Sequence, residues 1–452
     1  MAWAGYWLVV VGAVMAMVPV SLGRASVLYT FYPPLIGSPF YYLGVVLVVV
    51  GSWIWVALMS VNLRAWKKAN PGTPVPLPMF ANVAGSYLWA WTAVGAALEL
   101  ILQILPVAFG LRSTIDAGLS RVFFSWTLHA IVYFWLMPTY IAYYTIVPRA
   151  IGGKIYSDTM ARISFILFLV VAMPIGMHHT FADPQVGAGF KFIHSAFTAL
   201  VALPTLLTVF TICASVEIAA RLRGGRGPFG WIKVLPWSNP MMLAVAFSFV
   251  MLGFGGAGGL INMSYQLDAS IHNTQWITGH FHLIFGGAIV IMYFAIAYDL
   301  CHTSPSGLGD LRLIRTQLWL WFVGMIVTTF PWHWSASSHA APHGLLRLRR
   351  PGGCHAGLLG HPLGHWRLHP GGLGALFILV LVRGHRAPRR MPAPTGSPRP
   401  CTPPLTVPAL NGYALWVALM VGLTVTNYGF PIAQLALRED TSVPAVYVGA
   451  NP

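Results

Sequence analysis

The sequence has little charge. Of its 452 residues, 8% are Asp, Glu, Lys or Arg, and Asp and Glu together number only 10. A soluble domain carries roughly 25% charged residues. Apolar residues make up 57% of the chain, and the mean hydropathy is +0.69. This composition argues against a water-soluble globular protein.

Cysteine is also scarce. The four cysteines are Cys213, Cys301, Cys354 and Cys401, and no two of them have a CxxC spacing. The spacing argues against a disulfide framework and against a thiolate metal centre within this chain. We therefore expect any electrons used by a cofactor here to arrive from another subunit.

Apolar runs are abundant and long. About 20 apolar residues suffice to span a bilayer as a helix. We count about eleven such runs, near 4–22, 41–62, 80–109, 122–147, 162–181, 190–220, 240–262, 275–299, 313–334, 361–382 and 412–436. The pattern predicts an all-α, polytopic membrane bundle of about eleven transmembrane helices. We expect one large embedded domain with no soluble domain, cleavable signal peptide or repeat.

The net charge of +16 raises the question of a nucleic-acid partner. The basic clusters "RAWKK" (64–68), "PRAIGGK" (148–154), "RLRGGRGPFGWIK" (221–233) and "LRLIR" (311–315) occupy alternate predicted loops. Positive residues collect in this way on the inner side of a membrane. We therefore interpret them as topology signals beside a lipid bilayer and expect no nucleic-acid partner.

Five histidines lie within or at the ends of apolar runs. His178 and His179 stand side by side in "VVAMPIGMHHTFADP", His129 lies in "SWTLHAIVYFWLMPTYIAYYT", and His280 and His282 lie in "QWITGHFHLIFGGAIVIMYF". A lone membrane histidine is often only a hydrogen-bonded interior residue. Five together are harder to explain in that way, because ionisable groups inside a membrane are costly and usually functional.

Helix geometry groups these histidines. His280 and His282 are about 200° apart on a helix and point to opposite sides, so they are suited to two separate cofactors. A three-imidazole site suits copper or zinc, and a single imidazole binds haem iron axially. His129, His178 and His179 are thus candidates for one copper site. Tyr133 follows His129 by four residues and shares its helix face.

At this point a family resemblance becomes specific. The segments "HAIVYFW", "HHTFADP" and "HNTQWITGHFH", in this order, resemble subunit I of the haem–copper oxygen reductases. They are most similar to the B-type branch, the ba-type cytochrome c oxidases, as are "LYTFYPPL", "SDTMARISFILFL" and "RLRGGRGPFGWI". The resemblance runs from near Trp3 to about Trp334, and again from about Leu376 to the end.

The resemblance implies roles for the histidines. His129, His178 and His179 would bind the copper called CuB, and Tyr133 would be joined covalently to His129. His280 would bind the iron of the high-spin haem, and His282 would be one axial ligand of the low-spin haem. We expect further cofactor contacts beside the haems from the loop residues Asp268, His272 and Asn273.

The resemblance also implies a proton path. Tyr133, Tyr140 and Tyr144 fall within roughly 40° on one helix face. Together with the stripe Thr205, Thr208 and Thr211, they would line the single proton channel of the B-type enzymes. Alternatively, the threonines bond back to helix carbonyls. The intramembrane Glu99 is compatible with a structural hydrogen bond and with proton handling.

The implied function is that of the catalytic subunit of a terminal oxidase in a prokaryotic plasma membrane. It would reduce O2 to water with electrons from cytochrome c, delivered through a subunit II that carries CuA, and would translocate protons. A nitric oxide reductase-like enzyme is an alternative that Tyr133 disfavours. A different class is a non-catalytic remnant or a transporter that uses buried histidines.

The sequence departs from the family at three places. Leu128–His129–Ala130 replaces a usual Gly-His-Pro, which predicts a straighter helix and altered geometry without loss of copper. The first apolar run matches the third helix of the family, so two helices, and with them one low-spin haem ligand, are expected to be missing. Six histidines crowd into residues 339–369 among Gly, Pro and Arg. We interpret 337–375 as a frameshifted segment between a core (1–336) and C-terminal helices (376–452), although a His-rich tract can also bind metal.

The frameshift interpretation predicts the outcome of resequencing the gene across the codons for residues 335–376. A single-base correction should replace the His-rich stretch with a segment that contains a Pro-Arg-Arg motif followed by an apolar helix. Confirmation of every codon would contradict it.

Overall fold

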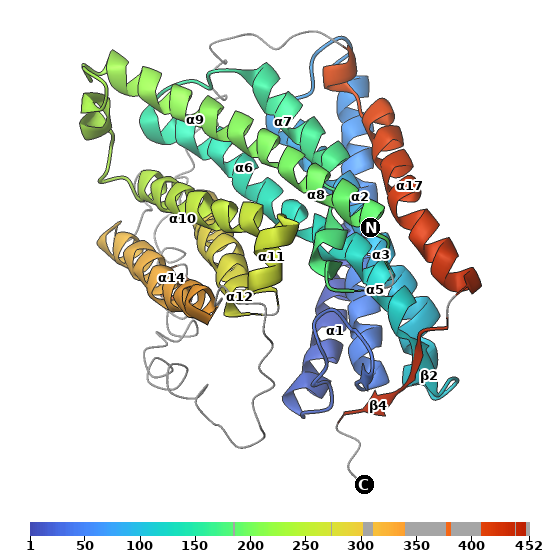
Figure 1. Ribbon diagram of the computed structural model, residues 1–452. Coiled ribbons are helices and arrows are strands. Elements are labelled where there is room, and N and C mark those ends of the chain that lie inside the picture. The colour runs from blue at the N-terminus through green and yellow to red at the C-terminus, as the bar shows by residue number, and fades with distance from the viewer. Residues whose placement is uncertain are drawn as a thin grey trace. The chain divides into compact units, whose positions relative to one another are not determined.

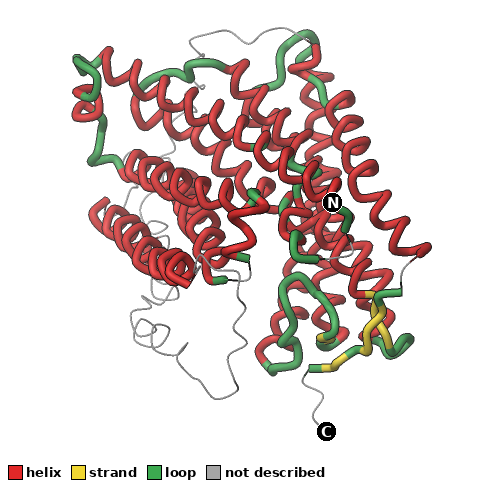
Figure 2. Tube along the Cα trace, viewed as in Figure 1, coloured by secondary structure: helices red, strands yellow, loops and turns green. Residues whose placement is uncertain are grey.

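The computed structural model describes residues 1–183, 186–272, 274–301, 311–339, 377–380, 408–438 and 440–448 (Figure 1). Within these ranges nine helices are long and apolar enough to cross a membrane. Figure 2 shows how strongly helix dominates. The prediction of an all-α, multi-pass membrane bundle is confirmed.

Nine of the eleven predicted spans are found. The run 162–181 differs, because its helix α7 (Asp158–Val171) stops early and a turn follows. The run 361–382 lies outside the described residues except for 377–380. The frameshifted segment predicted for 337–375 also lies outside them beyond residue 339.

The chain forms two compact units, residues 1–137, 157–210 and 402–452 in the first and residues 138–156 and 211–401 in the second. The first unit holds these elements: α1 (Ala2–Ser21), β1 (Leu35–Ile36), α2 (Pro39–Ala69), α3 (Leu77–Glu99), the π-helix η1 (Leu100–Ile104), α4 (Leu105–Ala108), β2 (Thr114–Asp116), α5 (Ala117–Leu128), α7, the 3-10 helix η2 (Gly176–Thr180), α8 (Ala188–Leu200), η6 (Pro408–Asn411), α17 (Ala414–Arg438), β3 (Ser442–Pro444) and β4 (Val446–Tyr447). The second holds η3 (Gly230–Val234), α10 (Pro240–Asn262), α11 (Tyr265–Ile271), α12 (Gln275–Phe281), the π-helix η4 (His282–Ile289), α13 (Val290–Cys301) and α14 (Leu311–His339). The helices α6 (Ala130–Ile151) and α9 (Ala202–Leu222) begin in the first unit and end in the second.

Glycines bring α1 and α2 together as an antiparallel pair (Figure 1). Gly12 faces Gly44, and Gly5 faces Gly51. A Cβ built on Gly12 would lie 2.6 Å from the Gly44 carbonyl oxygen. Small residues at membrane helix contacts allow such close backbone approach, so dispersion forces can act over the whole length of the pair.

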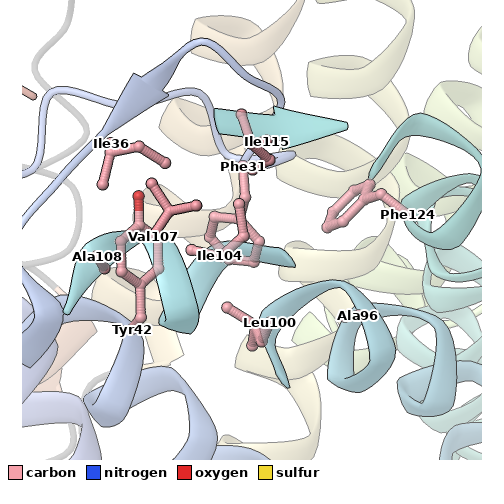
Figure 3. Close-up of a cluster of buried hydrophobic side chains, with 10 residues drawn as sticks. All are labelled: Phe31, Ile36, Tyr42, Ala96, Leu100, Ile104, Val107, Ala108, Ile115 and Phe124. Atoms are coloured by element: carbon pink, nitrogen blue, oxygen red, sulfur yellow. The ribbon is translucent and has the colours of Figure 1, made fainter. Parts of the chain in front are cut away.

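One end of the first unit is covered by loops and four short strands that the sequence did not predict. β1 pairs in parallel with β4, and β2 pairs in antiparallel fashion with β3. The Tyr447 hydroxyl donates to the Val107 carbonyl at 2.5 Å, which ties the C-terminal strands to α4. A cluster of buried apolar side chains fills the space beside these strands (Figure 3): Phe31, Ile36, Tyr42, Ala96, Leu100, Ile104, Val107, Ala108, Ile115 and Phe124.

The second unit packs α10 against η4, α13 and α14, and α14 against α12. A polar chain crosses its apolar interior: the Tyr143 hydroxyl lies 2.5 Å from the Ser248 hydroxyl, which donates to the Ala288 carbonyl at 2.5 Å. Because the Ser248 proton goes to Ala288, Tyr143 is the donor to Ser248. This chain links α6, α10 and η4.

The glycine contact predicts the effect of Gly12→Ala. The added methyl group must push α1 away from α2, and overpacking of this kind costs about 1–3 kcal/mol. Gly253→Ala is a matched control, because nothing lies within 4 Å of a Cβ at that helical glycine. We expect a lower thermal unfolding midpoint in detergent for Gly12→Ala only; equal midpoints would contradict the packing argument.

Candidate metal centre

His129, His178 and His179 meet in the first unit. Each contributes one ring nitrogen, and the three nitrogens lie within 4.8 Å of one another. The ring centroids of His178 and His179 are 4.1 Å apart, and those of His129 and His178 are 4.4 Å apart. His178 is 2% exposed. The sequence prediction that these three imidazoles form one cluster therefore agrees with the structure.

His129 stands at an interruption between two helices. α5 ends at Leu128 and α6 begins at Ala130, so the helix is not continuous here even though no proline follows the histidine. The expectation of a straighter helix was wrong. The His129 carbonyl accepts from the Val132 N–H at 3.1 Å, a tight turn that restarts the helix.

The two ring nitrogens of His129 face different partners. Nδ1 lies 2.7 Å from Nε2 of His179, and Nε2 lies 3.1 Å from the Tyr133 hydroxyl. Two nitrogen lone pairs at 2.7 Å repel unless a proton or a metal ion lies between them. The cluster therefore uses Nδ1 of His129, and its other nitrogen is left for the phenol.

The paired histidines lie in the short helix η2, beyond the end of α7 rather than at a long helix terminus. The Thr198 hydroxyl of α8 donates its one proton to the His194 carbonyl at 2.6 Å. It must then accept from Nδ1–H of His178, which lies 2.9 Å away. This bond fixes the tautomer of His178, with the proton on Nδ1 and the lone pair on Nε2.

These residues fit a copper or zinc ion. Metal–imidazole bonds of about 2 Å place ligand nitrogens about 3 to 3.5 Å apart, which small ring movements reach from the observed arrangement. The cluster offers three neutral imidazoles, the donor type that copper and zinc share. The site is buried, and at least one ligand already has its second nitrogen engaged, as metal-bound histidines usually do.

The other two histidines lie in the second unit, and they point apart as predicted. His280, at the end of α12, donates from Nδ1 to the Gly255 carbonyl of α10 at 2.7 Å. His282, the first residue of η4, donates from Nδ1 to the Thr278 carbonyl at 2.8 Å, and its ring packs edge-on against Trp332 of α14. Because Nδ1 carries the proton in both rings, the lone pair on Nε2 is the one that could bind a haem iron axially. Gly258 and Gly259 make room for the His280 ring, because a Cβ on either would lie within 3.2 Å of it.

Two of the three residues predicted for an outer loop come together, but the loop prediction is wrong for Asp268, which lies in the short helix α11. His272 Nδ1 lies 2.8 Å from Oδ2 of Asp268, one helical turn earlier, and Asp268 is buried. The carboxylate therefore orients the imidazole ring. Asn273 lies outside the described residues.

The predicted hydroxyl groups are mostly buried. Tyr140, Tyr144, Thr208 and Thr211 are buried, and Thr205 is partly exposed. The Thr208 hydroxyl lies 2.8 Å from that of Ser164, which donates to the Pro204 carbonyl at 2.7 Å. Thr208 and Ser164 therefore share a hydrogen bond between α9 and α7. Glu99 accepts a hydrogen bond from the Ser120 hydroxyl at 2.7 Å. This is the structural hydrogen bond that was one of the two roles expected for Glu99.

Sequence reasoning missed several residues that hold the cluster. Thr198 and His194 lie in a predicted span, and the argument that singled out the other membrane histidines applied equally to His194. Gly176 begins η2, and a Cβ there would lie 1.7 Å from the Ser125 carbonyl oxygen of α5. Gly176 and Pro174, two residues earlier, were the sequence signals that could have revealed this turn.

The fold and the three-imidazole cluster define a multi-pass membrane protein with a buried group of histidines that could hold a metal ion. Residues 1–349 match the family described as "Cytochrome C and Quinol oxidase polypeptide I". The chain belongs to this family, as subunit I of a haem–copper oxidase.

Individual relatives agree with this assignment. Cytochrome c oxidase subunit 1 of Thermus thermophilus is 44% identical over 338 residues, which cover 74% of this chain and 60% of the relative. Quinol oxidase subunit 1 of Sulfolobus acidocaldarius is 23% identical over 258 residues, 55% of this chain and 47% of the relative. A cryo-EM structure of a haem–copper terminal oxidase dimer matches with a TM-score of 0.87 and 31% identity, covering all of this chain and 81% of that one. The chain spans about 60% of the length of the Thermus relative.

The contact at Gly176 predicts that Gly176→Ala weakens metal binding. The methyl group cannot be placed against the Ser125 carbonyl, so the turn that carries His178 and His179 must move. Gly187→Ala, just beyond this turn, is the matched control because nothing lies within 4 Å of its Cβ. Copper per protein, measured by mass spectrometry of the purified complex, should fall in the first variant and stay at the wild-type level in the second.

Proposed function

We propose that this chain is the catalytic subunit of a B-type terminal oxidase in a prokaryotic plasma membrane, which reduces O2 to water and translocates protons. The observation that carries the proposal is the constellation of His129, His178 and His179 with a tyrosine hydroxyl against the outer nitrogen of His129. Membership of the oxidase family supports it. The motifs shared with the B-type branch favour that branch over others.

The residues of the first unit would hold CuB, and His280 and His282 would hold the high-spin and the low-spin haem. Bound there, the haem iron and the copper supply the electrons and the Lewis acidity that oxygen reduction needs. The chain's own contribution is to fix the ligands: Thr198 orients His178, and the break after α5 aims Nδ1 of His129 at the cluster. We propose that Asp268 and His272 contact haem propionates.

Tyr133 is the residue that we propose as donor of a proton and an electron. Its hydroxyl lies beside Nε2 of His129, the nitrogen that does not face the other histidines. A covalent bond to this ring, as the family resemblance implies, would keep the phenol in place. The presence of a tyrosine here disfavours the nitric oxide reductase alternative.

A proton route would reach Tyr133 along α6 and α9. Tyr140 and Tyr144 follow Tyr133 by seven and eleven residues. The rise of the helix therefore separates the Cα atoms of Tyr133 and Tyr140 by about 10 Å, and those of Tyr140 and Tyr144 by about 6 Å. Thr205, Thr208 and Thr211 would supply the second side of the route.

We propose cytochrome c as the electron donor and a subunit II with CuA as the partner that delivers electrons. The first relative named above is a cytochrome c oxidase, but a quinol oxidase subunit is also similar. Oxygen uptake by the purified complex with reduced cytochrome c, compared with a reduced quinol, separates these donors. Turnover with the quinol alone would overturn the donor assignment.

Removal of one copper ligand tests the catalytic proposal. His179→Ala should abolish copper binding and oxygen uptake, because two imidazoles cannot hold the ion, while haem content stays unchanged. The reduced-minus-oxidised and carbon monoxide difference spectra supply the haem control. Retained oxygen consumption in this variant would refute the copper assignment. A wild-type complex without carbon monoxide-reactive haem would instead favour the alternative class, a non-catalytic remnant or a transporter that uses buried histidines.

A further inference from the structure

Tyr428 lies in the last long helix, α17, and its side chain is fully buried. Its hydroxyl oxygen accepts the N–H of Gly176 at 3.1 Å. Its one proton faces two backbone carbonyls, those of Ser125 at 3.0 Å and Met173 at 3.3 Å. A single phenol therefore joins α5, the end of the turn after α7, and the start of η2.

These backbone groups stand close to the copper ligands along the chain. Gly176 precedes His178 by two residues, and Ser125 precedes His129 by four, one turn of α5. The Tyr428 hydroxyl thus connects the two segments that must approach each other for His129 to meet His178 and His179. A residue without a Cβ is required at position 176 for this approach, because the Ser125 carbonyl occupies the space that a Cβ would take.

A second side chain extends the same arrangement. His194 of α8 packs edge-on against the Tyr428 ring, with centroids 5.1 Å apart and an angle of 86°. Its Nδ1 accepts the N–H of Met177 at 3.2 Å, so the imidazole is neutral with its proton on Nε2. Two successive backbone N–H groups, those of Gly176 and Met177, are therefore bound by side chains immediately before His178.

We infer that Tyr428, supported by His194, is a positioning residue of the copper site: it sets the separation between the α5 segment that carries His129 and the turn that carries His178 and His179. This inference rests on the proposed copper site. Tyr428 has no ligand role, and it acts through the backbone. Loss of its hydroxyl leaves the Gly176 N–H without this acceptor and the Ser125 carbonyl without this donor inside an apolar environment, where unpaired backbone groups are costly. The Met173 carbonyl still accepts the Ile175 N–H at 2.9 Å.

Tyr428→Phe removes only the hydroxyl and tests the inference. Tyr413→Phe is the matched control, because Tyr413 is also buried, directly precedes α17, and donates to the Phe80 carbonyl at 2.9 Å. Both variants lose one buried tyrosine hydroxyl. Only Tyr428→Phe loses the hydrogen bonds to the segments that carry the proposed copper ligands. The measurement is the rate at which the purified, haem-loaded complex loses copper to an excess of chelator.

We expect copper loss about tenfold faster in Tyr428→Phe, the size of effect seen when groups outside a metal's ligands are removed. Tyr413→Phe should lose copper at the wild-type rate, and haem content should match in all three proteins. Wild-type copper retention in a folded Tyr428→Phe would overturn the inference, as would equal acceleration in both variants. A wild-type complex without copper would instead refute the proposed function.

If Tyr428→Phe does not fold, two variants of His194 test the inference instead. His194→Asn keeps an acceptor near the Met177 N–H, and His194→Leu removes it. Faster copper loss in His194→Leu with rescue in His194→Asn supports positioning through the backbone. Equal copper retention in these two variants would overturn it.

Discussion

Backbone that leaves helical geometry inside an apolar layer must be hydrogen-bonded by the protein itself, because no water is there to do so. In the first unit, the interruption at His129 and the turn that follows α7 are two such places. Both carry copper-ligand candidates. The polar side chains around the turn serve two purposes: Tyr428 and His194 bind its backbone N–H groups, and Thr198 orients the His178 imidazole.

The same chemistry recurs in the second unit without a turn. His280 and His282 each donate from Nδ1 to a backbone carbonyl, one on a neighbouring helix and one on its own. The π-helix η4 begins at the second of these histidines. π-helices recur at functional sites because their extra residue per turn redirects side chains. In this unit the helix itself, rather than a break in it, gives the two rings their opposite directions.

Much of this arrangement could be predicted from the sequence. Uninterrupted apolar runs marked nine spans, and the positions of five histidines, together with the matched family motifs, indicated both the triad and the divergent pair. The run 162–181 was read as one span because "VVAMPIG" is as apolar as a helix interior, and hydropathy does not reveal that residues 172–180 form a turn. Pro174 and Gly176 were the available signals. The break at His129 was missed for the opposite reason: its usual sequence cause, proline, is absent.

The contacts of Tyr428 could not be found in this way. It lies 252 residues beyond Gly176 and 303 beyond Ser125, and a tyrosine in an apolar helix looks like any other core aromatic. Only the folded first unit brings these segments together.

That separation has a consequence for biosynthesis. The segments with His129, His178 and His179 leave the ribosome long before α17. While the rest of the chain is made, two backbone groups of the turn, the Gly176 N–H and the Met173 carbonyl, therefore lack the Tyr428 hydroxyl. Contacts between such distant segments form late, because the loop between them must close first. The geometry of the three-histidine cluster is thus completed only after α17 has been made and inserted into the membrane.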